Sequence, residues 1–218
     1  MTTYSGRMTF LASRNVRTLA ATLVTLSLVT LDCTLNASAS SAVPTHLAQN
    51  VEPSFGASLT SRMSTIFHDI SLDSLPQAEK VFFPESAYIT MKTGRIPSPA
   101  KDYVNRLIGF FGLDLAAYHA SLFTHGSSTF LGVNVNPADA AWIQPGWCEN
   151  SIGYWHIPGV RLVYRQDKVV RSVAVASLIS WQGVWYVVHL GPNPRPRYLG
   201  TVDAPALGRG IPGPAGGC

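Results

Sequence analysis

The stretch from Arg161 to Gly191 constrains the fold of this chain more than any other, because long runs of strand-forming residues alternate with short polar breaks. The runs RLVYRQ, VVRSVAVASLISW and VWYVVHLG are rich in Val, Ile, Tyr and Trp, and the pairs Asp167-Lys168 and Gln182-Gly183 separate them. Two-residue breaks are common connections in β-hairpins. The stretch therefore predicts a meander of three antiparallel strands.

In such a meander, successive side chains alternate between the two faces of the sheet. One face, which runs from Leu162 through Val175 to Leu190, is mostly apolar and must be covered by other parts of the chain. The other face is small, mixed and partly polar, because Arg and Ser dilute its apolar residues. Besides Arg and Ser, this mixed face carries Val163, Ala174, Ala176, Leu178, Trp185, Val187 and His189.

Residues 1–39 have the three parts of a secretory signal peptide. These are a positive start with Arg7, Arg14 and Arg17, a short apolar run at residues 19–31, and the cleavage motif Ala37-Ser38-Ala39. The apolar run is well short of the ~20 residues that span a bilayer, which disfavours a retained membrane anchor. A lipoprotein anchored through Cys33 is disfavoured because the acidic Asp32 precedes it. We therefore expect a secreted or cell-envelope (extracytoplasmic) protein that meets the membrane only transiently, through this leader.

The length and composition of the chain fit one well-buried domain with tails. A chain of 218 residues with 46% hydrophobic residues is too short for two large domains. The net charge is +4, and three of the 16 basic residues lie in the leader. Outside the leader there is no block of Lys and Arg interleaved with aromatic residues, so we expect no nucleic-acid partner.

Removal of the leader would leave two cysteines, Cys148 and Cys218. An even number of cysteines in an oxidising compartment favours a disulfide between them. Such a bond would tie the carboxyl terminus to the region of Trp147, and closing so long a loop stabilises a fold by about 4 kcal/mol in the chain-entropy model. A free, reactive Cys148 and an intermolecular bond through Cys218 are the alternatives.

The hydrophobic pattern predicts an α+β domain at residues 57–191, between a flexible spacer at 40–56 and a tail at 192–218. Apolar residues at helical spacing predict a helix over 57–75 and a long helix that begins at Ser98-Pro99 and ends near Thr124. Residues 81–92 indicate a loop followed by a short strand, and 129–135 a further strand. The tail is rich in Pro and Gly, which predicts no regular structure, so we expect the disulfide to hold it.

These elements predict a fold in which two main helices pack on one face of a curved antiparallel sheet of four to six strands that ends in the meander. We expect the long helix to lie across the covered face of that meander. A pocket between helix and sheet is the place where a ligand would bind.

The region from about Phe83 to Cys218 resembles a group of exported actinobacterial proteins. The segments that carry the resemblance are PESAYITMK, AWIQPGWCENSIGYWH, RLVY, VASLISWQGVWYVVHLGPNPRP and the closing GPAGGC. The resemblance implies no reaction, cofactor or substrate. In element order, helices followed by a bent antiparallel sheet are similar to the cone-shaped NTF2-like class, whose members include enzymes, binders and dimerisation modules.

Several residues could carry chemistry, and each also has a structural interpretation. Cys148 with His156 could form a nucleophile and its base, although a structural disulfide is the favoured role of Cys148. Asp114 could work as an acid or base with His119 or His189, although a buried Asp bonded for structural reasons is commoner. His119 and His125 lack the spacing of a metal site, and no phosphate loop or H-E-x-x-H motif occurs, so we predict no metal and no cofactor.

Three hypotheses for function follow. The first is a non-enzymatic exported module that binds a small ligand or an envelope protein in the helix–sheet pocket. The second is a small hydrolase or isomerase that uses Asp114 with His119 or His189. The third is a structural subunit of an envelope complex, which would have an exposed apolar patch and no pocket. The sequence indicates no oligomeric state. For the first hypothesis, the predicted ligand-binding residues are Tyr118, Trp155, His156, Trp185, Tyr186 and His189.

Overall fold

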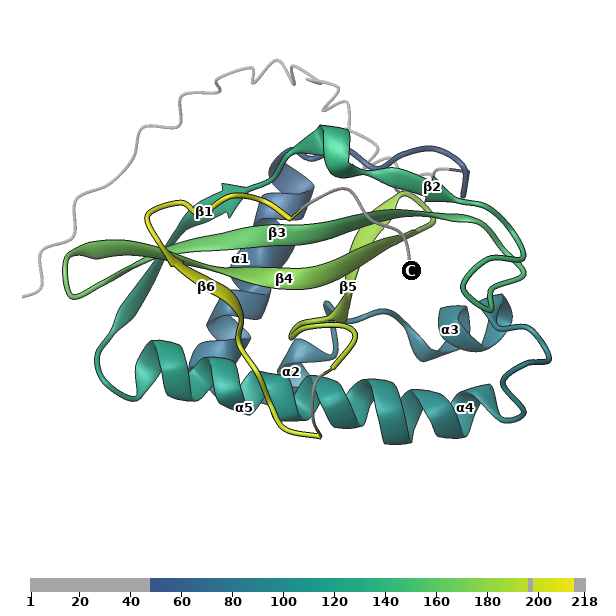
Figure 1. Ribbon diagram of the computed structural model, residues 1–218, viewed down its shortest axis with the longest axis horizontal. Helices are drawn as coiled ribbons and strands as arrows, with labels where there is room; N and C mark the ends of the chain where they lie inside the picture. The colour runs from purple at the N-terminus through teal and green to yellow at the C-terminus, as the bar shows by residue number, and fades with distance from the viewer. Residues whose placement is uncertain (1–47, 196–197, 214–218) are drawn as a thin grey trace, which may run out of the picture. The chain divides into compact units, whose positions relative to one another are not determined.

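The computed structural model describes residues 48–195 and 198–213, which form helices in the first half and strands in the second (Figure 1). The predicted leader lies outside the described residues. The helical elements are α1 (Ala57–Ser71), α2 (Leu75–Ala78), α3 (Glu85–Met91), α4 (Pro99–Asp102), the π-helical η1 (Tyr103–Ile108), α5 (Gly109–Phe123) and the 3₁₀ turn η2 (Pro137–Asp139). The strands are β1 (Ser128–Asn134), β2 (Ala141–Ile143), β3 (Tyr154–Gln166), β4 (Val169–Trp181), β5 (Val184–His189) and β6 (Asp203–Leu207).

The strands form one curved antiparallel sheet of six strands in the order β1-β3-β4-β5, with β2 paired to β3 and β6 paired to β4. The predicted two-residue turns connect β3 to β4 and β4 to β5. Asp167, Lys168, Gln182 and Gly183 have φ of 49°, 67°, 50° and 81°. Positive φ at both central residues gives the tight turn whose twist matches that of the flanking strands. The α+β class and the curved antiparallel sheet are therefore confirmed.

The carboxyl-terminal tail differs from the prediction, because it adds the strand β6 to the sheet. Leu207 pairs with Arg171 and Asp203 with Ala174, and the register shifts between these pairs. Pro205 lies in the shifted part, where a residue without an N–H is tolerated at the edge of a sheet. The sheet thus does not end in the strand β5, and the prediction that residues 192–218 form no regular structure is wrong for residues 203–207.

Residues 81–92 also differ from the prediction, because the extended part precedes the helical part. Phe83 donates its N–H to the oxygen of Val187 on β5 at 2.8 Å, so the chain first runs alongside the sheet. Pro84 then caps α3, where a fixed φ suits a helix start. Tyr88 and Met91 are three residues apart and both buried, which is helical spacing. The short strand predicted here is therefore a helix.

The spacer predicted at residues 40–56 is packed against the sheet over its described part. Gln49 donates its side-chain amide to the oxygens of Gly153 and Ser180, both at 3.2 Å. Phe55 stacks on Trp185 with ring centroids 5.3 Å apart. From residue 48 onward the predicted spacer therefore packs against the sheet, and its flexibility stays a prediction.

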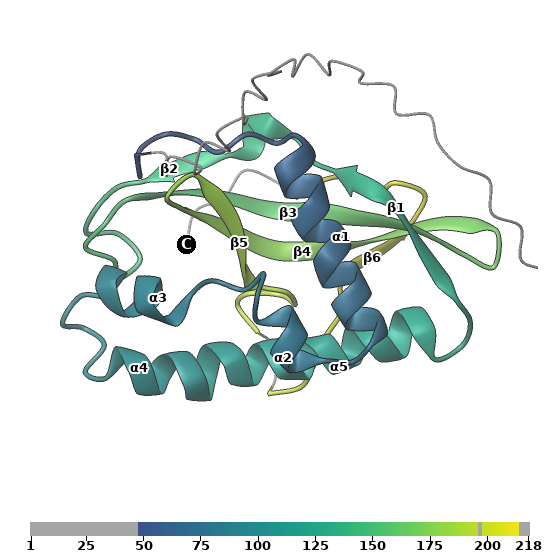
Figure 2. The ribbon, with the colours of Figure 1, turned by 180° about the vertical axis from the view of Figure 1, so that it is seen from behind.

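The helix that crosses the sheet is α1 rather than the long helix. Figure 2 shows α1 in front of β3 and β4, while α4 and α5 run lengthwise along the lower side of the sheet. Phe67 of α1 packs against Tyr164 of β3, with ring centroids 5.8 Å apart. The face expected to be mixed is also deeply buried, at Val163, Ala174, Leu178, Trp185 and Val187. The segment before α1 covers one of these residues, because Phe55 stacks on Trp185.

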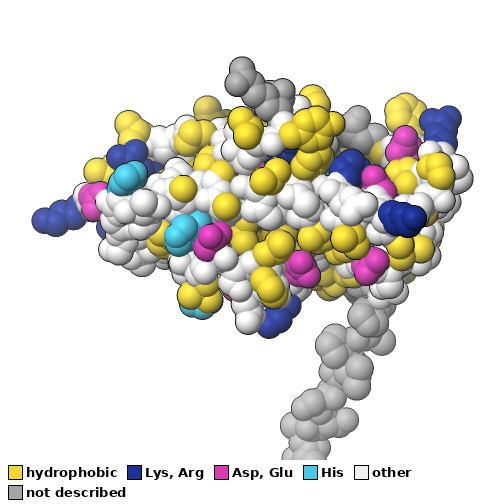
Figure 3. All heavy atoms as spheres, turned by 90° about the horizontal axis from the view of Figure 1, so that it is seen from below, with side chains coloured by type: hydrophobic (Ala, Val, Ile, Leu, Met, Phe, Trp, Pro, Cys, Tyr) yellow, Lys and Arg dark blue, Asp and Glu magenta, His cyan; other side chains and the backbone are white. Residues whose placement is uncertain are grey.

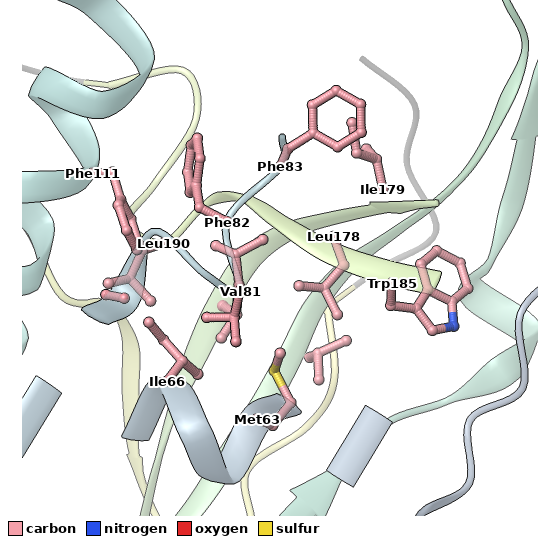
Figure 4. Packing of buried hydrophobic residues seen from close by; sticks show 14 of the residues in the cluster. Met63, Ile66, Val81, Phe82, Phe83, Phe111, Leu178, Ile179, Trp185 and Leu190 are labelled. Carbon is pink, nitrogen blue, oxygen red and sulfur yellow. The ribbon is translucent and has the colours of Figure 1, made fainter. Parts of the chain in front are cut away.

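Neighbouring residues of β4 pack into different parts of the core. Figure 4 shows Ile179 turned toward Phe83, while Leu178 points away from them. On the helical side, Phe82 packs on Phe111 of α5 with centroids 4.4 Å apart. Both faces at this end of the sheet are therefore occupied by side chains. None of the helices in the described part of the chain has the length and hydropathy needed to cross a bilayer.

Candidate functional site

A pocket of about 630 Å³ lies between the helical segments α3, α4 and η1 and the strands β3, β4 and β5. We call it the main pocket. Phe83 and Ile179, which face each other in Figure 4, belong to its wall, together with apolar side chains from both layers. Its lining residues are Phe83, Tyr88, Met91, Lys92, Ile96, Asp102, Arg106, Leu107, Cys148, Glu149, Asn150, Tyr154, His156, Pro158, Ala176, Ser177, Ile179, Val188, His189 and Asn193.

A hydrogen-bonded network of Tyr88, Asp102 and Arg106 forms one polar part of the wall. Arg106 donates through Nε at 2.8 Å and Nη2 at 2.6 Å to the two carboxylate oxygens of Asp102, one helical turn away. Tyr88 donates its hydroxyl to Asp102 and accepts from Nη2 of Arg106 at 2.9 Å. Hydrogen bonds from Arg106 lower the pKa of Asp102, and burial raises that of Tyr88. The network therefore holds a carboxylate, a guanidinium and a neutral phenol.

Lys92 extends the polar wall from the end of α3. Its backbone is fixed by a bridge to Asn150, which joins the helix end to the loop before β3. Its ammonium lies 4.9 Å from the centre of the Tyr88 ring and 3.4 Å from the carbonyl oxygen of Cys148. Burial lowers the pKa of Lys92. Both contacts are weak, so the ammonium keeps the capacity to donate to a ligand.

His189 lies at the end of β5 and faces the same pocket. Burial lowers its pKa to about 4, and the positive charges of Arg106, Arg195 and Lys92 act in the same direction. The imidazole is therefore neutral at pH 7, with one nitrogen that donates and one that accepts. A neutral imidazole beside cations indicates that this part of the pocket has a positive potential.

His156 and Ser177 form a hydrogen-bonded pair across β3 and β4. Nε2 of His156 and Oγ of Ser177 are 2.7 Å apart, and each residue is 8% exposed. A hydroxyl within hydrogen-bond distance of an imidazole has the spacing of a nucleophile and its base. The same spacing also serves to satisfy two buried polar groups.

Two of the six predicted ligand-binding residues, His156 and His189, line the main pocket. The other four lie elsewhere, because the core and the amino-terminal segment use them. Tyr118 is fully buried, and its hydroxyl bonds the oxygens of Ala174 and Leu190 at 2.5 and 2.9 Å and accepts from the N–H of Asp203 at 2.9 Å. The other three residues contact the amino-terminal part of the described chain. Trp155 Nε1 donates to the oxygen of Asn50, Trp185 Nε1 donates to the oxygen of Pro53, and the guanidinium of Arg62 lies over the ring of Tyr186.

Asp114, which was predicted to work with a histidine, instead bonds residues of the carboxyl-terminal tail. Its carboxylate accepts from Nη1 and Nη2 of Arg195 at 2.9 and 2.5 Å, and from the N–H groups of Gly191 and Thr201 at 3.0 and 3.1 Å. A Cβ added at Gly191 would lie 2.6 Å from this carboxylate, so only glycine fits the approach. Within residues 48–195 and 198–213, no hydrogen bond joins Asp114 to His119 or His189.

The other candidate residues are not brought together either. His119 bonds the oxygen of Ile70 at 2.9 Å and stacks on Phe123. His125 is exposed and lines a second pocket of about 360 Å³. In the described part of the chain, no group of three or more His, Cys, Asp or Glu side chains could hold a metal ion.

Cys148 and His156, the predicted nucleophile and base, both line the main pocket. The second cysteine of the predicted disulfide, Cys218, lies outside the described residues. The pairing of Cys148 with Cys218 therefore stays a prediction.

The network residues Tyr88, Asp102 and Arg106 and the neighbouring Lys92 were not among the site residues predicted from the sequence. A signal for part of this set was present, because Asp102 and Arg106 are four residues apart at the start of the predicted long helix. Tyr88 and Lys92 belong to the segment that was predicted to form a loop and a strand, and so they could not be placed on the same wall.

Comparisons of the chain with protein-family models, with curated proteins and with solved structures found no match.

Proposed function

We propose that this protein is an exported binding module that holds a small, largely apolar ligand in the main pocket. The observation that carries the proposal is a pocket of about 630 Å³ whose apolar wall faces a hydrogen-bonded polar wall. Ligand sites in proteins commonly have volumes of 300–1,000 Å³ and a few fixed polar groups on an apolar lining. The network of Tyr88, Asp102 and Arg106 supplies such fixed groups.

The location of the protein and its fold family belong to the same proposal. The leader at residues 1–39 supports export to the cell envelope or beyond it. Helices that precede a curved antiparallel sheet and enclose a pocket with it support an analogy with NTF2-like proteins.

Filling the pocket tests the proposal. Ala176 lines the pocket on β4, and the side chain of Ala176→Phe would occupy ligand space. Native mass spectrometry of the protein purified from its own cells should show a bound small molecule in the wild type. We expect the variant to lose that molecule, because space in a close-packed site cannot hold both.

Ala116→Phe is the matched control, because Ala116 is exposed on α5 and does not line the pocket. It should retain the molecule at the wild-type level, and both variants should unfold at temperatures close to that of the wild type. A wild-type protein without a bound molecule, or equal retention by Ala176→Phe, would contradict the proposal.

Hydrolysis is a second candidate function, and the pair of Ser177 and His156 favours it. The hydroxyl could pass its proton to Nε2 of His156 as it attacks an ester carbonyl, given their separation of 2.7 Å. A fluorophosphonate should then label Ser177 with loss of fluoride, as mass spectrometry of peptides would detect. Labelling should disappear in Ser177→Ala and slow at least tenfold in His156→Gln. Absence of label on Ser177 of the folded wild type would leave the pair a purely structural role.

The hypothesis of a structural subunit receives less support from the surface. Such a subunit would dock through a continuous apolar patch of several hundred Å². Figure 3 shows the face over α4, η1 and α5, where hydrophobic side chains alternate with charged and neutral ones. Val104 and Leu113, 54% and 42% exposed, are among the apolar residues of these helices. Single exposed apolar residues of this kind are normal on soluble proteins.

A further inference from the structure

Among the described residues that line the main pocket, the cation Lys92 has no bonded carboxylate partner. Asp102 offsets Arg106 through two hydrogen bonds, so this pair contributes little net charge. Lys92 has no ion pair among the interactions of residues 48–195 and 198–213. Glu149 has the largest acidic influence on the pKa of Lys92, but its side chain is exposed, so water screens its charge.

Among the described residues that line the main pocket, Lys92, His189 and Arg106 each have an N–H donor without an acceptor. The ammonium of Lys92 has three N–H donors, and within residues 48–195 and 198–213 it makes a single weak hydrogen bond, to the oxygen of Cys148. Arg106 uses Nε and Nη2 for its network, which leaves the donors of Nη1. These groups come from the end of α3, from η1 and from β5, so the fold itself brings them to one place.

We propose that the main pocket selects apolar molecules that carry a single carboxylate, which pairs with Lys92 beside His189. This inference rests on the proposed binding function and adds the chemical class of the ligand. A monoanion matches the one cation that lacks a partner. A phosphate monoester would bring a second charge without a partner into a half-buried site, which costs free energy.

Three probes with the same ten-carbon chain test the inference: decanoate, decan-1-ol and decylamine. We expect decanoate to bind the wild type about ten- to a hundredfold more tightly than decanol, as one charge-assisted hydrogen bond is typically worth. Decylamine should bind most weakly, because its cation would meet Lys92. Isothermal titration calorimetry at low ionic strength measures all three.

Substitution of Lys92 tests whether the preference for decanoate over decanol comes from the charge of this side chain. Lys92→Met approximately keeps the length of the side chain and removes its charge, so decanoate and decanol should bind this variant equally. Lys92→Arg should keep the preference for decanoate. Lys101→Met is the matched control, because Lys101 is exposed on α4 and does not line the pocket. It should behave as the wild type does.

The titration of His189 gives a second readout that a merely structural lysine would not change. The groups whose charge lowers the pKa of this imidazole include Arg106, Arg195 and Lys92. An anion bound among them stabilises the imidazolium, so the pKa of His189 should rise from about 4. Decane-1-sulfonate is the probe, because a carboxylic acid would itself be protonated in this range. Histidine NMR spectra recorded against pH follow the shift, and decanol should cause none.

The outcomes separate the two proposals. If decanol and decanoate bind equally in the wild type, or if sulfonate leaves the pKa of His189 unchanged, the carboxylate inference is overturned while the pocket remains a binding site. If none of the probes binds, or if Ala176→Phe binds them as the wild type does, the proposed binding function fails and this inference fails with it.

Discussion

Replacement of Asp114 with alanine is expected to lower the free energy of unfolding by about 3–5 kcal/mol, because it leaves a buried guanidinium without its partner. The side chains of Asp114 and Arg195 are 2% and 9% exposed and their closest atoms are 2.5 Å apart. The substitution also removes the acceptor of the N–H groups of Gly191 and Thr201. Urea denaturation followed by circular dichroism measures the change.

A double-mutant cycle shows whether the loss comes from the ion pair. Arg195→Ala should destabilise the fold by a similar amount, and the double variant should lose much less than the sum of the two single losses. Glu79→Ala, which removes an exposed carboxylate, is the matched control and should change stability by less than about 0.5 kcal/mol. A loss below about 1 kcal/mol in Asp114→Ala, or additive losses in the cycle, would show that the tail is held in another way.

The role of Asp114 could not be predicted from the sequence, because its partners are distant along the chain. The groups that bond it are 77, 81 and 87 residues away, in a tail whose Pro and Gly content predicted no structure. The strand β6 was missed for the same reason. Five residues that include Pro205 have little strand propensity of their own, and their pairing with β4 is a long-range interaction.

The strands and turns of the second half were predictable, because their signals are local. The turn at Gln182-Gly183 and the runs of Val and Ile around it identify a hairpin without any knowledge of the rest of the fold. The helix α1 was also visible from its apolar spacing. What could not be predicted was where it lies, since a helical stripe shows that a face is buried but does not show what covers it.

The main pocket was only half predicted. His156 and His189 lie on strands whose register follows from the hairpins, so their place near one another could be expected. The other wall depends on α3, which was predicted as a loop and a strand, and on the contact of α3 with the loop at Asn150. A wall built from two segments about 60 residues apart leaves no pattern in either segment alone.

The largest core effect is expected at Trp185, which the sequence analysis placed in the ligand site. Trp185 is 2% exposed, stacks on Phe55 and donates Nε1–H to the oxygen of Pro53 at 3.1 Å. Truncation of a buried tryptophan to alanine typically costs 3–5 kcal/mol, through lost burial and the cavity that remains. We expect Trp185→Ala to destabilise the fold by about that amount.

Trp147 provides the matched control, since the same substitution removes a tryptophan that is 68% exposed. Trp147→Ala should change the free energy of unfolding by less than about 0.5 kcal/mol. Because Trp185 does not line the main pocket, Trp185→Phe, which keeps an aromatic ring in the core, should bind decanol with the wild-type affinity once folded. Equal stability losses for Trp185→Ala and Trp147→Ala would contradict the role of Trp185 in the core. A tenfold loss of decanol affinity in a folded Trp185→Phe protein would show that Trp185 contributes to ligand binding.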